Sequence, residues 1–255
     1  MALTKTAVIL VTGASSGIGE ATVKRFAKEG YLVVAGARRL DKLQALEKQF
    51  PGRIMPFVLD VTKRKDVEEA VKKIQKEIGP IDVLINNAGL ALGLDPAHKA
   101  NIEDWDHVVD VNIKGLLYCT KAVLPSMVER NQGYIINIGS VAGTYPYPGG
   151  NVYGATKAFV HQFSLNLKAD LLGTNVRVTC IEPGLVETEF SLVRYHGDQQ
   201  KARSVYEDAE ALLPDDIAEL IYTCATQKSH VNINTIEVMP VCQASGKFEI
   251  NRNKH

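Results

Sequence analysis

Short runs of β-branched and other apolar residues alternate along the chain with amphipathic stretches of helical period. This alternation is typical of βαβ units. The runs are almost continuously apolar, as in parallel strands buried beneath helices on both faces. The pattern therefore predicts a single α/β domain with a doubly wound parallel sheet of about seven strands. The expected strands lie within residues 7–13, 31–38, 53–61, 81–89, 133–140, 176–184 and 233–241.

Two segments do not follow this alternation of strands and helices. Residues 187–213 are too many for a simple connection and are rich in charged and aromatic side chains, which indicates a functional lid over a site. The polar tail 244–255 is expected to be partly disordered or to pack on a neighbouring subunit. Elsewhere the helix ends are regular, and Gly79-Pro80 and Gly173 mark two of them.

The composition fits one globular domain over residues 1–255, with 45% hydrophobic residues and 29 basic against 29 acidic side chains. This charge balance gives no indication of nucleic-acid binding. The first residues carry one lysine and a short apolar run, without the cleavage site of a signal peptide. No apolar segment approaches the roughly 20 residues of a membrane span. We therefore expect no membrane partner.

The four cysteines show neither CxxC spacing nor a pairing pattern. They are Cys119, Cys180, Cys224 and Cys242. A soluble protein of a reducing compartment, the cytoplasm, is the resulting prediction. No Cys/His cluster has ligand spacing, so no metal site and no zinc-dependent alcohol oxidation are predicted.

The stretch VTGASSGIGEA, residues 11–21, joins a predicted strand to a predicted helix through a glycine-rich turn. Backbone N–H groups and the helix dipole attract phosphate there, and glycines let a nucleotide approach. The spacing Gly13-x-x-x-Gly17-x-Gly19 differs from the commoner GxGxxG, and a turn that merely packs helix on strand is the alternative. The expected cofactor contacts are Gly13, Ser15, Ser16, Gly17, Ile18 and Gly19.

Arg38 and Arg39 follow the second predicted strand, where NAD-binding enzymes of this architecture usually place an acidic residue. Guanidinium forks pair with a 2′-phosphate, so the cofactor NADP is favoured over NAD. The alternative is a solvated charge pair at a helix start.

Polar residues also end the third and fourth predicted strands. The Asp60 carboxylate, beside Val61, can accept a hydrogen bond from the adenine amino group, or it can cap the helix that begins near Thr62. The small polar stretch Asn86-Asn87-Ala88-Gly89 can tie neighbouring strands together and leave room for a ribose. As an isolated tetrapeptide it would be a turn.

The candidate chemistry lies in Ser140, Tyr153 and Lys157. Tyr153 and Lys157 have i,i+4 spacing, which places them on one face of a helix. A neighbouring ammonium stabilises a phenolate and lowers the tyrosine pKa from about 10 towards the working range. Ser140 ends the fifth predicted strand, where its hydroxyl can donate to a carbonyl oxygen during hydride transfer. Taken one at a time, Tyr153 and Lys157 would be neighbours on a helix surface, and Ser140 would be a serine in a turn.

These motifs make the chain resemble the short-chain dehydrogenase/reductase family from about residue 6 to residue 241. The matching residues are Thr12-Gly13-x-x-x-Gly17-Ile18-Gly19, Asn86-Asn87-Ala88-Gly89, Asn112, Ser140, Tyr153-x-x-x-Lys157 and Pro183-Gly184. The resemblance implies a Rossmann-type fold in which Tyr153 is the acid/base and Ser140 polarises the substrate oxygen. It implies that Lys157 binds the nicotinamide ribose and lowers the tyrosine pKa.

Other roles rest on this resemblance alone. Asn112 would hold a water molecule in a proton relay. Residues 183–190, after the sixth strand, would contact the nicotinamide end of the cofactor. The contacts expected there are Pro183, Gly184, Val186 and Thr188.

Residues 86–98, 149–160, 181–198 and 230–240 resemble a subgroup, the NADP-dependent 3-hydroxy acid dehydrogenases. This likeness implies oxidation of L-serine, L-allo-threonine, 3-hydroxypropionate or 3-hydroxyisobutyrate, and reduction of malonic semialdehyde. It also implies a homotetramer, which apolar helices such as residues 153–172 can build. Val186-Glu187-Thr188 departs from a glycine-rich variant of the loop in relatives, which bears on loop flexibility and not on catalysis.

A small carboxylated substrate needs a cation at its anionic end, because burying an unpaired carboxylate costs several kcal/mol. Arg194, within the predicted lid, is the best-placed candidate for binding substrate, and lid closure can bring its fork onto the acid. The alternative is a surface salt bridge. His98 and His196 are weaker candidates.

Two other functions compete with the hydroxy acid dehydrogenase. One is an NADPH-dependent reductase of bulkier ketones or aldehydes, since loops build the substrate pocket in this family. The other is a nucleotide-sensing or scaffolding protein that kept the fold and lost the reaction. The presence of Ser140, Tyr153 and Lys157 together counts against the second.

Overall fold

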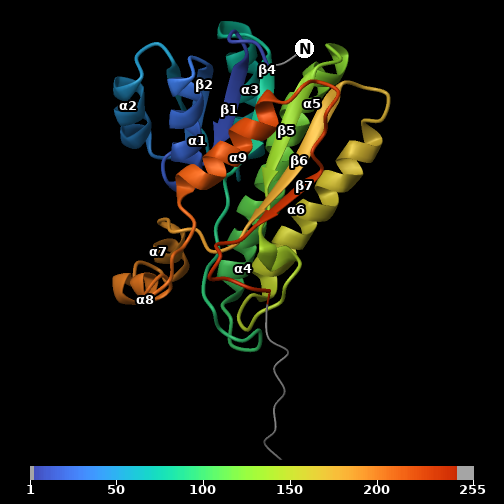
Figure 1. Cartoon of the computed structure of the whole chain (residues 1–255). Coiled ribbons are helices and arrows are strands. Elements are labelled where there is room, and N and C mark those ends of the chain that lie inside the picture. The colour runs from blue at the N-terminus through green and yellow to red at the C-terminus, as the bar shows by residue number, and fades with distance from the viewer. Residues whose placement is uncertain (1–2, 246–255) are drawn as a thin grey trace, which may run out of the picture.

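The computed structural model describes residues 3–245. Its centre is a parallel seven-stranded sheet in the order β3-β2-β1-β4-β5-β6-β7 (Figure 1). The strands are β1 (Val8–Thr12), β2 (Leu32–Ala37), β3 (Ile54–Val58), β4 (Ile81–Asn86), β5 (Gly133–Ile138), β6 (Val176–Pro183) and β7 (Thr235–Val238). Each lies within a run predicted from the sequence, and the fold class is confirmed. Beyond residue 245, the predicted tail lies outside the described residues.

Helices cover both faces of the sheet. One face packs against α1 (Gly17–Lys28), α2 (Leu40–Gln49) and α9 (Pro214–Thr226), and the other against α3 (Arg64–Glu77), α5 (Leu116–Glu129) and α6 (Asn151–Asp170). The shorter elements are α4 (Ile102–Val109), the π-helical turn η1 (Asp110–Gly115), the 3₁₀ turn η2 (Val141–Gly143), α7 (Phe190–Arg194) and α8 (Gln199–Ser204). Across residues 3–245, no helix combines the length and the apolarity needed to cross a membrane.

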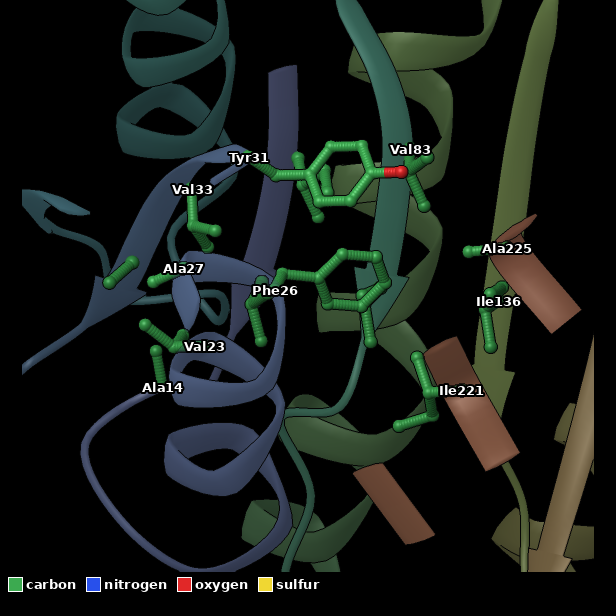
Figure 2. Close-up of a cluster of buried hydrophobic side chains, with 14 of the residues drawn as sticks. Ala14, Val23, Phe26, Ala27, Tyr31, Val33, Val83, Ile136, Ile221 and Ala225 are labelled. Atoms are coloured by element: carbon green, nitrogen blue, oxygen red, sulfur yellow. The ribbon is translucent and has the colours of Figure 1, made fainter. Parts of the chain in front are cut away.

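The two apolar cores explain why the strands read as continuous hydrophobic runs. In β1, Ile9 and Val11 belong to the core beneath α1 and α9, whereas Val8 and Leu10 belong to the opposite core. Successive side chains of a strand point to opposite faces, so both sets are apolar. Figure 2 shows the first core, in which Phe26 of α1 lies near Tyr31 and Ile221 of α9.

The edge strands differ from the prediction of burial on both faces. In β3, Met55 and Val58 are exposed, and β7 is only half-buried. Each edge strand has a neighbour on one side alone, and fewer helices reach it. Pro56 within β3 fits this position, because proline cannot donate to a second neighbouring strand.

The connection of the strands creates a crevice at one end of the sheet. The chain winds outward from β1 through β2 to β3 and then crosses back to β4 on the other side of β1. At such a switch point, loops leave the carboxyl ends of β1 and β4 in opposite directions and open a ligand crevice between them. The glycine-rich turn and the stretch Asn86-Asn87-Ala88-Gly89 both lie there.

Candidate active site

A cleft of about 790 Å³ opens at the carboxyl ends of the strands. The fold brings nearly all of the predicted site residues to its wall. Those lining the cleft are Gly13, Ser15, Ser16, Gly17, Ile18, Arg38, Arg39, Asp60, Val61, Asn87, Ala88, Gly89, Ser140, Tyr153, Lys157, Pro183, Gly184, Val186, Thr188 and Arg194. The two predicted residues behind the wall are Gly19 and Asn112, both buried.

The glycine turn has no space for side chains at its three glycines. Gly13 and Gly17 have positive φ angles of 65° and 52°, which favour glycine. A Cβ atom on Gly19 would lie 2.3 Å from the carbonyl oxygen of Gly13. The turn therefore presents bare backbone at the start of α1, which is how proteins bind a pyrophosphate. These features fit a dinucleotide cofactor.

Side-chain amides tie the strands together on either side of the switch point, as predicted. The Asn87 amide donates to the carbonyl oxygens of Thr12 (2.9 Å) and Gly13 (3.2 Å), joining β4 to the turn after β1. The Asn86 amide donates to Asn137 Oδ1 (2.9 Å), joining β4 to β5. These bonds hold the crevice floor in a fixed shape.

Arg39 reaches from the end of β2 over the glycine turn. Its Nε donates to Ser15 Oγ (3.1 Å), and its guanidinium pairs with Glu189 (3.1 Å) at the start of α7. Arg38 lines the same part of the cleft. Both cations thus stand where a 2′-phosphate would lie if a dinucleotide followed the turn.

Asp60 does not cap α3, whose N-cap residue is Lys63, and the prediction of a cap is wrong. Its Oδ1 accepts from the Thr62 hydroxyl (2.7 Å) and backbone N–H (3.1 Å), just before α3, while the residue also lines the cleft. Burial alone raises the pKa of Asp60, but the bonds from Thr62 and the nearby Arg38 outweigh it and lower the pKa. Asp60 therefore carries an anionic carboxylate at neutral pH.

Ser140 and Tyr153 face each other from two elements. Ser140 ends the loop after β5, where its Oγ accepts from the Ala142 N–H (3.1 Å) and fixes the start of η2. Tyr153 lies in the first turn of α6, with its ring 5.5 Å from that of Phe190. A hydrogen bond from Ser140 lowers the pKa of Tyr153. The two hydroxyls can therefore contact one substrate oxygen.

Burial has the largest effect on the pKa values of Tyr153 and Lys157. Burial raises the pKa of Tyr153 to about 12, against the opposite effects of Ser140 and Arg194. Burial lowers the pKa of Lys157 to about 8. The Lys157 ammonium donates to the carbonyl oxygen of Ile138 (2.8 Å) and lies 5.8 Å from the Tyr153 ring centroid. Burial therefore has the largest effect on the pKa of both groups, and the lowering of the Tyr153 pKa by Lys157 stays a prediction.

Asn112 lies in the π-helical turn η1, and not in regular α-helix. Its side chain accepts from the Leu90 N–H (2.9 Å), donates to the Leu90 carbonyl (2.8 Å) and donates to Thr156 Oγ1 (3.0 Å). These three bonds join η1 to the loop after β4 and to α6. Turns of this kind are frequent at functional sites, and the sequence carried no signal for one.

The segment 187–213 begins and ends beside β6. An isolated parallel bridge joins Val186 to Leu212, and α7 and α8 lie between these positions. The segment touches the cofactor turn, because the side chain of Thr188 lies 3.3 Å from the place of a Gly17 Cβ atom. Arg194, at the end of α7, lines the cleft. Among residues 3–245, no carboxylate pairs with its guanidinium.

Three contacts in the cleft were not predicted from the sequence, although Glu189 and Phe190 lie within the predicted range 183–190. Tyr147 accepts from Arg194 Nη2 (2.7 Å), Phe190 packs near Tyr153, and Glu189 pairs with Arg39. All three lie on irregular or short segments, where no period in the sequence signals which way a side chain points. The concentration of aromatic residues in the run TYPYPGG was the available signal for Tyr147.

Comparison with known proteins agrees with this geometry. Residues 7–197 match the family model described as short chain dehydrogenase. An NADP-dependent 3-hydroxy acid dehydrogenase of Salmonella typhi is 56% identical over 247 residues, covering 96% of this chain and 100% of the relative. A solved closed form of serine dehydrogenase complexed with NADP⁺ is 53% identical with a TM-score of 0.95, covering 96% of this chain and 100% of that one. Serine dehydrogenase from Escherichia coli is 51% identical with a TM-score of 0.82, covering 93% and 99%.

The family model therefore spans the glycine turn, the strand-end asparagines, Ser140, Tyr153 and Lys157. The relatives match over nearly their full lengths. With the fold, the cleft and its residues in agreement, this chain belongs to the short-chain dehydrogenase family.

Proposed function

We propose that this chain is an NADP-dependent oxidoreductase that interconverts small 3-hydroxy acids and their 3-oxo forms. The substrates are L-serine, L-allo-threonine, 3-hydroxypropionate and 3-hydroxyisobutyrate in oxidation, and malonic semialdehyde in reduction. The observation that carries the proposal is a guanidinium without a carboxylate partner, that of Arg194, in the same cleft as the Ser140 and Tyr153 hydroxyls. The names of the relatives support the same substrate class.

In oxidation, the C3–H and O–H bonds of the substrate break and a C=O bond forms. Tyr153 acts in this direction as the phenolate, whose oxygen accepts the hydroxyl proton and becomes the neutral phenol, and Ser140 donates a hydrogen bond to the substrate oxygen. A bound NADP⁺ would supply the acceptor for the hydride, with its electron pair, that leaves C3. In reduction, Tyr153 returns the proton.

The remaining chain residues bind the cofactor and supply protons. The turn at Gly13, Gly17 and Gly19 is proposed to hold the pyrophosphate, and Arg38 with Arg39 the 2′-phosphate. Asp60 and Val61 are proposed to contact the adenine, and the stretch 87–89 a ribose. Lys157 is proposed to bind the nicotinamide ribose, and residues 183–188 the nicotinamide. Asn112 is proposed to position a water molecule for proton exchange, which its π-helical turn supports.

We propose that residues 187–213 form a lid over the cleft. Support comes from their place against both the cofactor turn and the substrate end, and from the likeness to the closed, NADP⁺-bound serine dehydrogenase. Limited proteolysis with and without NADP⁺ tests this. Protection of the lid on cofactor binding is expected, and unchanged cleavage would contradict it.

We also propose a homotetramer in the cytoplasm. Phe159 and Phe163 stack 5.7 Å apart on α6, and Leu165 and Leu172 nearby are exposed, which supports a subunit contact there. All four cysteines are free, which suits a reducing compartment. Light scattering tests the assembly, with a mass near four times 27.9 kDa expected.

The central experiment follows formation of the reduced cofactor, NADPH from NADP⁺ or NADH from NAD⁺, with 3-hydroxypropionate, L-serine, L-allo-threonine and 2-propanol. We expect turnover of the 3-hydroxy acids with NADP⁺, and its loss in Tyr153→Phe. A preference for uncharged alcohols or bulky ketones would contradict the substrate class and favour the carbonyl reductase alternative.

A further inference from the structure

Three segments meet at the substrate end of the cleft, beyond Tyr153. They are the loop after β4, the loop between η2 and α6, and α7. The Gly93 N–H donates to the Arg194 carbonyl oxygen (2.9 Å), and Arg194 Nε donates back to the Gly93 carbonyl oxygen (3.3 Å). Arg194 is thus fastened to the main chain of another segment, and its guanidinium has a fixed place.

Tyr147 supplies the third attachment. Arg194 Nη2 donates to the Tyr147 hydroxyl oxygen (2.7 Å). A tyrosine hydroxyl that accepts a hydrogen bond keeps its own hydrogen to donate. Among residues 3–245, no acceptor takes that hydrogen. The Tyr147 O–H and the Arg194 guanidinium together therefore form a donor set suited to a carboxylate.

This donor set lies close to the proposed acid/base. The guanidinium carbon of Arg194 is 5.3 Å from the Tyr147 ring centroid and 5.5 Å from the Tyr153 ring centroid. The charge of Arg194 lowers the pKa of Tyr153, whereas Tyr147 raises it, so both groups act electrostatically on the Tyr153 hydroxyl. A ligand that touches Tyr153 and this pair together has to be short.

Glycines in the intervening loop fix the position of Tyr147. A Cβ atom on Gly150 would lie 2.6 Å from the Tyr147 ring. Gly149 has a φ of +77°, and a Cβ atom there would lie 2.2 Å from the Leu94 carbonyl oxygen. The Tyr147 ring therefore packs directly on backbone, and a single added methyl group at residue 150 forces it to move.

We propose that Tyr147 is a specificity-determining residue, which with Arg194 clamps the substrate carboxylate and selects the distance from that carboxylate to the reacting hydroxyl. The inference rests on the proposed function and deepens it. A 3-hydroxy acid has one carbon between its carboxylate and its carbinol carbon, a 2-hydroxy acid has none, and a 4-hydroxy acid has two. Each carbon changes the span by about 1.5 Å or less. Because hydrogen bonds hold both Arg194 and Tyr147 in place, these donors do not move to reach the carboxylate of a shorter or longer substrate.

The test compares wild type with Tyr147→Phe on 3-hydroxypropionate, 4-hydroxybutyrate, glycolate and the neutral 3-hydroxypropionamide. In wild type we expect 3-hydroxypropionate to be preferred over each of the others. In Tyr147→Phe we expect kcat/KM for 3-hydroxypropionate to fall about tenfold, as for one lost hydrogen bond to a charged group, mainly through KM. The amide should change less than about twofold. The preference of Tyr147→Phe for 3-hydroxypropionate over 4-hydroxybutyrate should fall together with its kcat/KM for 3-hydroxypropionate.

Tyr145→Phe is the matched control. It removes the same atom from the same loop, but the Tyr145 hydroxyl donates to Glu237 on β7 (3.1 Å). Its acid-to-amide preference should equal that of wild type. Gly150→Ala is the second probe, and it should reproduce the loss of preference while NADPH binding persists.

The outcomes separate the two proposals. If wild type turns over the amide as well as the acid, the proposed function fails. A second outcome is that wild type prefers the acid over the amide while Tyr147→Phe keeps this preference and also the preference for the 3-hydroxy over the 4-hydroxy acid. In that case the proposed function stands and the proposed role of Tyr147 is wrong.

Discussion

The Nδ1 atom of His161 on α6 lies 2.6 Å from Oε1 of Glu182 on β6, directly behind the cleft. The Glu182 side chain is 3% exposed and that of His161 is 33% exposed. Cys180 Sγ, 3.6 Å from the same carboxylate oxygen, completes a group of three potential metal ligands. Glu182 precedes Pro183 of the cleft wall, and its Cγ lies 2.9 Å from the place of a Gly139 Cβ atom. This hydrogen bond therefore joins α6, the helix of Tyr153, to β6, and Glu182 also packs beside the loop that leads to Ser140.

The His161–Glu182 contact predicts a specific loss of stability. His161→Leu leaves the buried Glu182 carboxylate without its partner and should lower the free energy of unfolding by about 2 kcal/mol. His161→Lys should restore part of the loss, because the lysine can again donate a hydrogen bond to the Glu182 carboxylate. Urea unfolding followed by the fluorescence of the single tryptophan, Trp105, measures both. The double variant His161→Leu/Glu182→Gln should be more stable than His161→Leu alone; equal values would mean that packing, and not charge, holds this contact.

Because Lys157 is buried, replacing it with an apolar residue should increase stability and abolish activity. Its folded pKa of about 8 lies below the ordinary 10.5. Between these pH values the unfolded chain binds more protons, so the Lys157 contribution to stability rises with pH through this window. Lys157→Met should therefore raise the unfolding free energy at pH 7 by about 1–3 kcal/mol while abolishing turnover. The difference from wild type should narrow between pH 8 and 10.5. A pH-independent difference would contradict the burial of the charge.

The position of Arg39 predicts a selective loss of NADPH binding. Arg39→Ala removes a cation from the proposed 2′-phosphate site, and a charge-assisted hydrogen bond contributes about 1.5–3 kcal/mol, or roughly 10- to 150-fold in affinity. NADH affinity should stay within about twofold, since NADH lacks that phosphate. Fluorescence titration with both cofactors measures the ratio. Arg64→Ala, which breaks only the surface pair with Glu68, is the control. Parallel losses for NADPH and NADH would rule out a phosphate contact.

Two glycines separate a local backbone effect from an effect on the cofactor turn. Gly19 lies within α1, where alanine is favoured by about 1 kcal/mol, yet a Cβ there would lie 2.3 Å from the Gly13 oxygen and 2.5 Å from Asn87 Nδ2. The close contact should prevail, and Gly19→Ala should weaken NADPH binding by more than about tenfold. Gly30, with a φ of +86° and open space around it, is the comparison. Gly30→Ala should cost about 1 kcal/mol of stability and leave NADPH affinity unchanged. Equal NADPH affinities in the two variants would remove the turn from the cofactor site.

The sheet could be predicted because each strand and each helix is recognisable from its own stretch of sequence. Each strand is an apolar run long enough to stand out, and each helix between strands has its own period. The same holds for Tyr153 and Lys157, whose spacing along one helix is itself the signal. The edge strands were predicted less well, because a run such as residues 54–58 does not tell which strands will have one neighbour.

Long-range contacts were beyond the sequence pattern. The second half of α6 and most of β6 separate His161 from Glu182, and nothing in their spacing indicates that they meet. The same is true of Arg194 with Tyr147, and of Arg39 with Glu189. The pKa of Tyr153 depends mainly on burial, and burial is a property of the assembled cleft.

The bridge between Val186 and Leu212 has a consequence for how such a protein can change over generations. It brings the two ends of a long insertion together beside β6, so the insertion closes on itself and the sheet does not depend on what lies between. The entropic cost of closing a loop grows only slowly with its length. Beyond Glu189, the last residue of the segment that contacts Arg39, residues can therefore be added, removed or exchanged, and a descendant can acquire a new substrate while the cofactor half of the cleft is inherited unaltered.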